Sequence, residues 1–243
     1  MSLEFLSPAE SALARSPMER EARAAGARVE LRDGWNVAAR FDGELPERER
    51  CESSVGFADS SQLGKIELQA GAADLAQLVA AITGEALELG AATRAAGAWW
   101  CPYTPERALV LCEPGSVEAQ RAGLEEAAAS SAGPASVIDV TTAFAALTVV
   151  GPLAGELFAR FSAVDLRPAV MPLSGFRPVS VARTPGTVLR EGQQRYLMLF
   201  GAALGSYMWT VVADAAEGLG GGPVGVDALE SIDEPLTEAP SHA

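Results

Sequence analysis

The chain has 243 residues, 49% of them hydrophobic, and a formal net charge of −14. This length and composition are typical of a folded protein with one large domain or two small ones. Because no basic face offsets the acidity, the charge argues against a nucleic-acid-binding surface. No apolar run is long enough to span a bilayer, and the N-terminus lacks the order of a signal peptide, so we expect a cytoplasmic protein without a membrane partner.

Residue types that often carry catalysis are scarce. Cys51, Cys101 and Cys112 have neither the spacing of a disulfide framework nor that of a metal site, and we interpret them as buried thiols. The one histidine, His242, is the penultimate residue. A histidine triad or a histidine-ligated metal in an ordered core is therefore excluded. Any catalysis would depend on carboxylates, hydroxyls, backbone groups or a borrowed cofactor.

The N-terminal part of the chain predicts short elements. Residues 1–25 are interpreted as an arm with a charged helix that Gly26 ends. Residues 28–41 alternate weakly around Asp33-Gly34, which predicts a hairpin. Residues 42–52 are polar and charged, and we interpret them as a loop.

A strand, a glycine and a helix follow one another three times. The clearest copy has a strand over residues 138–150, apolar on both faces as in the middle of a sheet, then Gly151-Pro152 and a helix over 153–161. An earlier copy places a half-buried strand at 65–69 before a helix that ends at Gly84. A later copy has a strand at 196–200 and a helix from 204.

The remaining elements complete an α+β pattern. Residues 98–112 predict a hairpin, and residues 115–129 predict a helix. We therefore expect mixed sheets with helices, built from split βαβ-type units in two similar halves. The main domain is placed at residues 26–230, and residues 231–243 are interpreted as a disordered acidic tail.

Three segments in order resemble the folate-binding aminomethyltransferase family, that of the glycine-cleavage T-protein. Residues 55–66 resemble its Gly-Leu-Phe-Asp-x-Ser-x-x-x-x-Lys segment, and residues 147–152 resemble its apolar strand that ends in Gly-Pro. Residues 181–184, followed by Trp209 and residues 224–229, resemble its third block. The resemblance covers most of the chain and implies the folate-binding domain of that family.

Within this family, the chain looks most like the gamma subunits of heterotetrameric sarcosine oxidases, which lack the C-terminal barrel. Ser16-Pro17-Met18, Arg32-Asp33-Gly34-Trp35 and the chain end after Leu229 carry this likeness. It implies a hetero-oligomer in which larger flavin-bearing subunits oxidise an N-methylated amino acid, with FAD, FMN or NAD on those partners. Tetrahydrofolate is then a possible ligand of this chain.

The resemblance also identifies candidate folate or ligand residues: Asp59, Leu63, Arg183, Glu191 and Trp209. The sequence departs from the T-protein, which has Arg-Thr-Gly-Tyr-Thr-Gly-Glu where this chain has residues 183–189 without the tyrosine. Glu191 aligns with the pterin-binding glutamate of the T-protein only if a gap is placed in the alignment. We therefore expect no catalytic residue and no metal site.

Some residues have two interpretations. Asp59 either binds a ligand or forms a side-chain hydrogen bond to the backbone of its own turn. Arg183 either pairs with a carboxylate or is solvated at a sheet edge. Trp99 and Trp100, adjacent in a strand, either anchor a partner interface or are covered on both faces. For the whole chain, a structural oxidase subunit and a stand-alone tetrahydrofolate-binding aminomethyltransferase both remain open.

Overall fold

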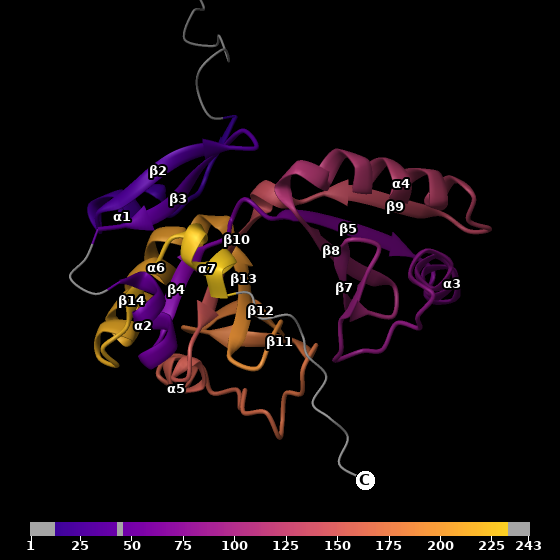
Figure 1. The fold of residues 1–243 in the computed structure, drawn as a ribbon. Helices are drawn as coiled ribbons and strands as arrows, with labels where there is room; N and C mark the ends of the chain where they lie inside the picture. The colour runs from indigo at the N-terminus through magenta and orange to yellow at the C-terminus, as the bar shows by residue number, and fades with distance from the viewer. Residues whose placement is uncertain (1–12, 43–45, 233–243) are drawn as a thin grey trace, which may run out of the picture.

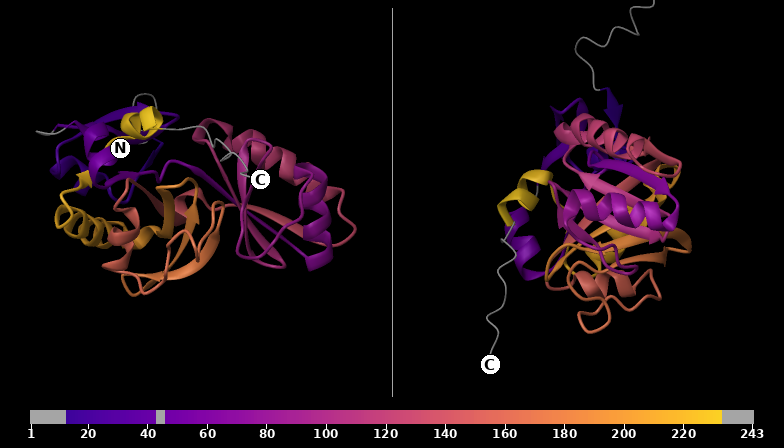
Figure 2. Two further views of the ribbon diagram at one scale, coloured as in Figure 1. Left: turned by 60° about the horizontal axis from the view of Figure 1, so that its bottom comes forward. Right: turned by 90° about the vertical axis from the view of Figure 1, so that its right-hand side faces the viewer.

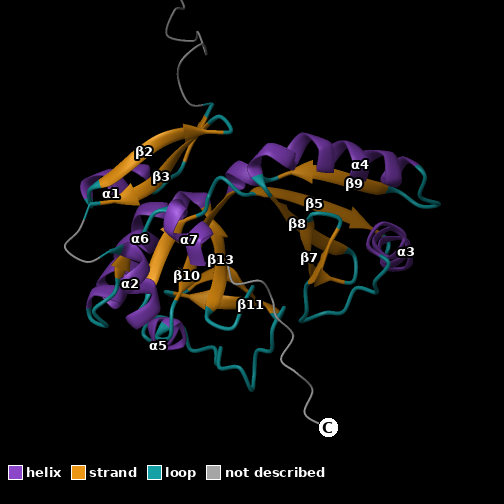
Figure 3. Ribbon diagram, in the orientation of Figure 1, coloured by secondary structure: helices purple, strands orange, loops and turns teal. Residues whose placement is uncertain are grey.

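The computed structural model describes residues 13–42 and 46–232, which form three sheets with helices around them (Figure 1, Figure 3). The first sheet is small and N-terminal, with strand order β1-β3-β2. The turn between β2 and β3 has Asp33 at φ 47° and Gly34 at φ 78°, a pair of left-handed residues that suits a tight hairpin. The elements of this part are β1 Ala14–Arg15, α1 Glu19–Ala24, β2 Ala27–Arg32 and β3 Trp35–Phe41.

The second sheet has six strands in the order β11-β12-β13-β10-β4-β14. Its strands are antiparallel except for the short β14, which runs parallel to β4. The strands are β4 Gly56–Asp59, β10 Phe144–Val150, β11 Phe176–Val181, β12 Thr184–Arg190, β13 Arg195–Gly201 and β14 Gly222–Pro223. The helices of this part are α2 Glu47–Ser53, α5 Ala154–Ala159, α6 Gly205–Glu217 and α7 Val226–Ile232.

The third sheet has five antiparallel strands in the order β6-β7-β8-β5-β9. Helices α3 and α4 run beside it, on the right in Figure 1. Its elements are β5 Gly64–Ala70, α3 Ala72–Thr83, β6 Thr93–Ala95, β7 Ala98–Thr104, β8 Arg107–Cys112, α4 Val117–Ala129 and β9 Ala135–Asp139. Single 3-10 turns lie at Pro114–Ser116, Thr141–Ala143 and Ala202–Leu204.

The two larger sheets share one chain order. In the five-stranded sheet, β5, α3, β6, β7, β8, α4 and β9 follow one another along the chain, with β8 between β5 and β7 in the sheet. In the six-stranded sheet, β10, α5, β11, β12, β13 and α6 follow one another along the chain, with β13 between β10 and β12 in the sheet. Each is a split βαβ arrangement. The predicted α+β class and its split units are confirmed.

The two sheets pack face to face, with their helices outside (Figure 2). The shared core joins Trp99, Cys101 and Leu109 of one sheet to Leu189 and Leu197 of the other. Separate cores lie under α3 and α4 on one side and under α5 and α6 on the other. Both larger sheets are therefore covered on both faces, which explains their long apolar runs.

The strand–glycine–helix copies that the sequence predicted occur at β5–α3, β10–α5 and β13–α6. β10 is central in its sheet and buried from Ala145 to Val150, as predicted. The predicted strand over 138–150 is wrong in one respect, because the turn at Thr141–Ala143 divides it between β9 and β10. That turn carries the chain from one sheet to the other.

Two predictions are corrected by the fold. Residues 42–52 are not all loop, because α2 covers Glu47–Ser53. The strand at 65–69 is not half-buried: Lys65 and Glu67, which alternate with its apolar residues, are also buried. Its second face lies against the rest of the protein rather than water.

The predicted tail at 231–243 overlaps the end of α7, and its remainder lies outside the described residues, as does most of the predicted arm. None of the described helices is long and apolar enough to span a membrane.

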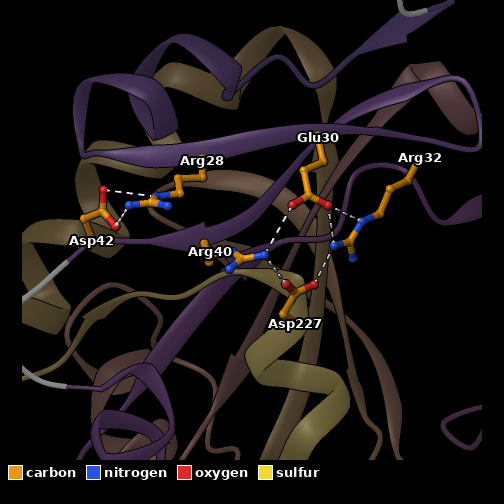
Figure 4. Close-up of polar contacts among 6 residues, drawn as sticks. All are labelled: Arg28, Glu30, Arg32, Arg40, Asp42 and Asp227. Carbon is orange, nitrogen blue, oxygen red and sulfur yellow. Dashed lines mark hydrogen bonds and ion pairs between the residues drawn. The ribbon is translucent and has the colours of Figure 1, made fainter.

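A group of ion pairs ties the N-terminal hairpin to α7 (Figure 4). Arg32 lies 2.7 Å from one carboxylate oxygen of Asp227, and Arg40 lies 3.7 Å from the other. Both arginines also pair with Glu30. The hydrogen bonds that Arg32 donates to Glu30 and Asp227 raise the pKa of Arg32. This network links the first sheet to the last described helix.

We expect Asp227→Asn to lower the free energy of unfolding by no more than about 1 kcal/mol, since the ion pairs are partly solvated. The loss should disappear in 1 M salt, where screening is strong. Urea unfolding at low and high salt measures both values. The matched control is Asp42→Asn, which removes the more exposed Arg28–Asp42 pair and should cost less. A loss that is independent of salt would contradict this electrostatic interpretation.

Candidate functional site

The candidate ligand residues lie in separate parts of the six-stranded unit. Arg183 stands at the β11–β12 turn, and Glu191 follows the other end of β12. A strand of this length separates them by about 25 Å, at roughly 3.3 Å per residue. Asp59 pairs with Leu147 in the middle of β10. The sequence-predicted residues therefore do not converge on one site.

Asp59 belongs to a buried polar turn between β4 and β5, where the chain passes from one large sheet to the other. Its Oδ1 accepts a hydrogen bond from the backbone N–H of Ser61 at 3.0 Å. Burial raises the pKa of Asp59, opposed by hydrogen bonds from Ser16 and Ser61 and by the charge of Lys65. The turn interpretation of Asp59 fits these contacts.

The same turn is tied to the neighbouring strand β10. The hydroxyl groups of Ser60 and Thr148 lie 2.7 Å apart, and the backbone N–H of Ala146 donates to Ser61 Oγ at 3.2 Å. The side chain of Leu63 is half-buried and packs against the core between the two sheets. These residues fix the crossing between the sheets.

Lys65 is a central residue of this turn that the sequence interpretation missed. Its ammonium donates to the carbonyls of Ser61 and Leu63 at 2.8 Å each, and to that of Thr141 at 3.4 Å. Its exposed fraction is 0%. Desolvation lowers the pKa of Lys65 to about 8, opposed by the charges of Asp59 and Asp139.

These contacts give Lys65 a structural task. An ammonium group has three N–H donors, and here each has a carbonyl acceptor. Lys65 is also the only lysine in the chain. A sequence signal was therefore present: a single lysine, on a strand, within the Asp-Ser-Ser-x-x-x-Lys segment.

Glu191 lies in a second polar corner, after β12. Arg195 donates to its carboxylate at 3.2 Å, and both side chains are largely shielded from solvent. The neighbouring Arg190 is buried and donates to the carbonyls of Met171, Gly192 and Gln193. These contacts hold the β12–β13 turn together and tie it to Met171, and Arg195 also donates to the carbonyl of Leu229 in α7 at 3.4 Å.

Trp209 belongs to the core beneath α6. Its ring meets the ring of Phe57 edge-on at 5.1 Å and stacks on Phe41 at 6.3 Å. Only 5% of the residue is exposed. It therefore presents little surface to a ligand and instead joins α6, β4 and the N-terminal hairpin.

Of the two interpretations of Trp99 and Trp100, the burial of both side chains fits the one in which both faces of the strand are covered. The two side chains point to opposite faces of β7, as expected for neighbours in a strand, and both faces are covered. Trp99 is 5% exposed in the core between the sheets, and Trp100 is 0% exposed beneath the helices. Neither indole is available to a partner at the surface of the chain.

Arg183 lines an open cleft of about 470 Å³ between α5, α6 and the β11–β12 turn. Tyr207 of α6 donates its hydroxyl to the Ala182 carbonyl at 3.0 Å and so fixes the turn. A smaller, mostly apolar cavity of about 210 Å³ lies beside α3. The lining of the larger cleft is Ala159, Arg160, Phe161, Ser162, Ala163, Ala182, Arg183, Tyr207 and Val211.

No described group of three or more His, Cys, Asp or Glu side chains could hold a metal ion. Cys51, Cys101 and Cys112 are free thiols and buried, in agreement with their interpretation from the sequence. Burial raises the pKa of the Cys51 thiol to about 11, so it stays protonated near neutral pH. His242 lies outside the described residues.

No protein-family model and no curated protein matches the chain. Among solved structures, a chain of the heterotetrameric sarcosine oxidase from Corynebacterium sp. U-96 in complex with pyrrole 2-carboxylate aligns over 85% of this chain and 96% of its own length. Its TM-score is 0.65 and its sequence identity 23%. The glycine cleavage system aminomethyltransferase T from Bartonella henselae aligns over 90% of this chain, with a TM-score of 0.72 and 17% identity.

The chain has the aminomethyltransferase fold. It spans 61% of the length of the Bartonella aminomethyltransferase, and no sheet among its described strands closes into a barrel. At these identities the likeness shows the fold alone. The fold expected from the sequence resemblance is confirmed.

The family that the sequence resembles binds folate, so the candidate residues can be compared with what a folate requires. A pterin needs a carboxylate and apolar walls that converge on one cavity. Here Asp59 bonds its own turn, Glu191 pairs with Arg195, and Trp209 lies in the core. The five candidate residues do not together form a binding site for a folate, and we assign no chemical step to one.

Proposed function

We propose that the chain is a gamma-type subunit of a heteromeric, flavin-dependent oxidase of sarcosine or another N-methyl amino acid, with a structural and interface role. One observation carries this proposal: the chain aligns with 96% of a chain of a heterotetrameric sarcosine oxidase. The flavin and any NAD would be bound by larger partner subunits. The amine would be oxidised there, and this chain would contribute contacts rather than chemistry.

The polar groups of the chain support a structural role. The buried turn at Asp59–Lys65 and the corner at Arg190–Arg195 satisfy their charges internally. A catalytic group needs a reacting atom within hydrogen-bond reach, and Lys65, with all three donors occupied, has none to offer. These networks fix the fold.

A second candidate is a stand-alone tetrahydrofolate-binding aminomethyltransferase-like protein. The TM-score of 0.72 with aminomethyltransferase T over 90% of this chain favours it. The wide separation of Arg183 and Glu191 disfavours this second candidate. Tight tetrahydrofolate binding by the purified chain, lost in Glu191→Ala and Arg183→Ala, would favour this candidate over the oxidase subunit.

We expect the tagged full-length chain, purified from its native cells, to bring a larger flavin-bearing protein at fixed stoichiometry. Mass spectrometry identifies the co-purifying chains, and the visible absorption spectrum detects the flavin. Oxidation of N-methyl amino acids by the complex then tests the substrate class. A chain that purifies alone and colourless would contradict the subunit proposal.

A further inference from the structure

The cleft beside Arg183 is a basic surface on an acidic protein. Its lining contains Arg160 and Arg183 and no acidic residue, although the chain carries a formal charge of −14. Among the described residues, neither guanidinium forms an ion pair. Arg160 donates one hydrogen bond, to the carbonyl of Gly218 at 3.2 Å. The positive charges of Arg160 and Arg183 therefore have no carboxylate partner among the described residues.

The backbones next to the two arginines are neighbours, because the N–H of Ala182 donates to the carbonyl of Phe161 at 2.8 Å. Tyr207, near the start of α6, bonds the turn that carries Arg183, whereas the side chain of Arg160 reaches the carbonyl of Gly218 just after the end of α6. Both arginines therefore line the same cleft along α6. Between the charges, the floor is partly apolar, with the half-buried Phe161 and Val211 and the ring of Tyr207, which is 47% exposed.

The backbone at Arg183 is unfavourable for this residue. Ala182 has φ 45° and Arg183 has φ 64°, so both central residues of the turn are left-handed. Tight hairpins usually place asparagine and glycine there, because other residues pay a steric penalty. Glycine would fit the turn better than arginine. The arginine side chain is thus kept at a cost in local conformational energy.

We propose that this cleft is a docking surface for an extended acidic segment of a partner subunit. The proposal rests on the proposed subunit role, since it needs a second chain. The segment has two carboxylates, one for each arginine, with apolar residues between them. An apolar side chain between them covers Phe161 and Val211. The cleft is open and shallow, so it suits a chain segment better than an enclosed small molecule.

Charge complementarity selects the occupant. Each arginine offers a planar fork of N–H donors that a carboxylate accepts in pairs. Asp214, farther along α6, is exposed and lies outside the lining. Its negative charge opposes an acidic segment at the Arg160 end. Arg183 is therefore the stronger of the two anchors.

The probe is a fluorescein-labelled hexapeptide, Glu-Leu-Ala-Phe-Leu-Glu, and fluorescence anisotropy with the full-length chain at low salt measures its binding. We expect Arg183→Gly to weaken binding at least about tenfold, as for loss of a charge-assisted bond pair. Its thermal midpoint should not fall, because glycine relieves the turn. Arg160→Gln should also weaken binding, and Asp214→Asn should strengthen it.

The matched control is Arg177→Gln. Arg177 is an exposed arginine on β11, outside the cleft, that also donates to a backbone carbonyl. It should leave binding within about twofold of the unchanged chain, as expected for distant surface charges. A second control is the same peptide with glutamine in place of both glutamates, which should not bind.

Several outcomes would overturn the docking surface. These are no binding by the unchanged chain, equal binding by Arg183→Gly, or an equal loss in Arg177→Gln. Tighter binding after removal of residues 233–243 would assign the cleft to the acidic tail of this chain instead. Self-association that Arg183→Gly abolishes would assign it to a second copy.

The subunit proposal fails independently, if the chain purifies without a flavin-bearing partner. If the partner co-purifies equally with the unchanged chain and with Arg183→Gly, the result supports the subunit role and contradicts the docking surface.

Discussion

Replacing Gly151 by alanine is expected to lower the free energy of unfolding by about 2–5 kcal/mol, the largest loss we expect from any added methyl group on the β10–α5 segment. Gly151 has φ +130°, a conformation that residues with a side chain rarely adopt. A Cβ there would lie 2.4 Å from the carbonyl oxygen of Ser54 and 2.7 Å from that of Cys51. These atoms belong to backbone and cannot turn away.

The matched control is Gly155→Ala, four residues later in α5. Gly155 is exposed, and a Cβ added there meets nothing within 4 Å. Alanine should stabilise the helix by up to about 1 kcal/mol. Urea unfolding followed by circular dichroism compares the two variants. If Gly151→Ala were as stable as the unchanged chain, the close approach of β10 to the end of α2 would be wrong.

The second large effect is expected at Lys65. Lys65→Met removes the donor from the carbonyls of Ser61, Leu63 and Thr141, which lie in the interior. Each buried carbonyl left without a partner costs about 1–3 kcal/mol, whereas removing a desolvated charge gives part of this back. We expect a net loss of about 2–4 kcal/mol near neutral pH.

The pH dependence of this loss identifies the buried ammonium. The pKa of Lys65 is about 8 in the folded chain and lowered from 10.5. Between these values the unfolded chain binds more protons, so the contribution of Lys65 to stability rises with pH. The stability gap between the unchanged chain and Lys65→Met should widen by roughly 3 kcal/mol from pH 8 to 10.5.

Urea midpoints across this pH range measure the gap. Gln69→Met, on the same face of β5, serves as the control and should leave the pH slope unchanged. The Cys112 thiol is electrostatically coupled to Lys65, so all three chains are compared with Cys112 replaced by alanine, and the other two buried cysteines then cancel in the comparison. Because Lys65 is the only lysine, its side-chain NMR signal reports the pKa directly. A gap that stays constant from pH 8 to 10.5 would show that Lys65 keeps an ordinary pKa.

Much of the secondary structure could be predicted from the sequence because its signals are local. The Asp33-Gly34 turn, the helix end at Gly84 and the break at Gly151 each depend on conformations that glycine favours, and the structure has all three at positive φ. The apolar periods of β10 and α6 predicted buried elements, and their residues are buried. Local chemistry specified where the chain turns.

The helix α2 was missed because little of its stability is local. Among its residues only Cys51 is buried, so no apolar period marks it. Its first residue, Glu47, instead accepts hydrogen bonds from the backbone N–H groups of Phe41 and Gly225, at 2.8 and 2.7 Å. Arg50 donates to the carbonyl of Pro223 at 2.7 Å. Two of these partners, Pro223 and Gly225, lie far away in sequence.

The candidate site shows the same limit. Resemblance to a family selected Asp59, Arg183 and Glu191 by their positions in motifs. The order of motifs does not show that β12 separates Arg183 from Glu191 by its whole length. The opposite faces of β7 likewise predicted that Trp99 and Trp100 point apart, and only the packing of a second sheet decided that both are buried.

The sequence by itself determined most of the elements and their α+β class, because turns, caps and apolar periods act between near neighbours. Tertiary structure alone decided which polar groups are buried and which face an open cleft. Lys65 and Arg183 are both cations next to turns, yet one is enclosed by three carbonyls and the other faces an open cleft. Burial depends on surfaces brought together from distant parts of the chain, and no local pattern encodes that.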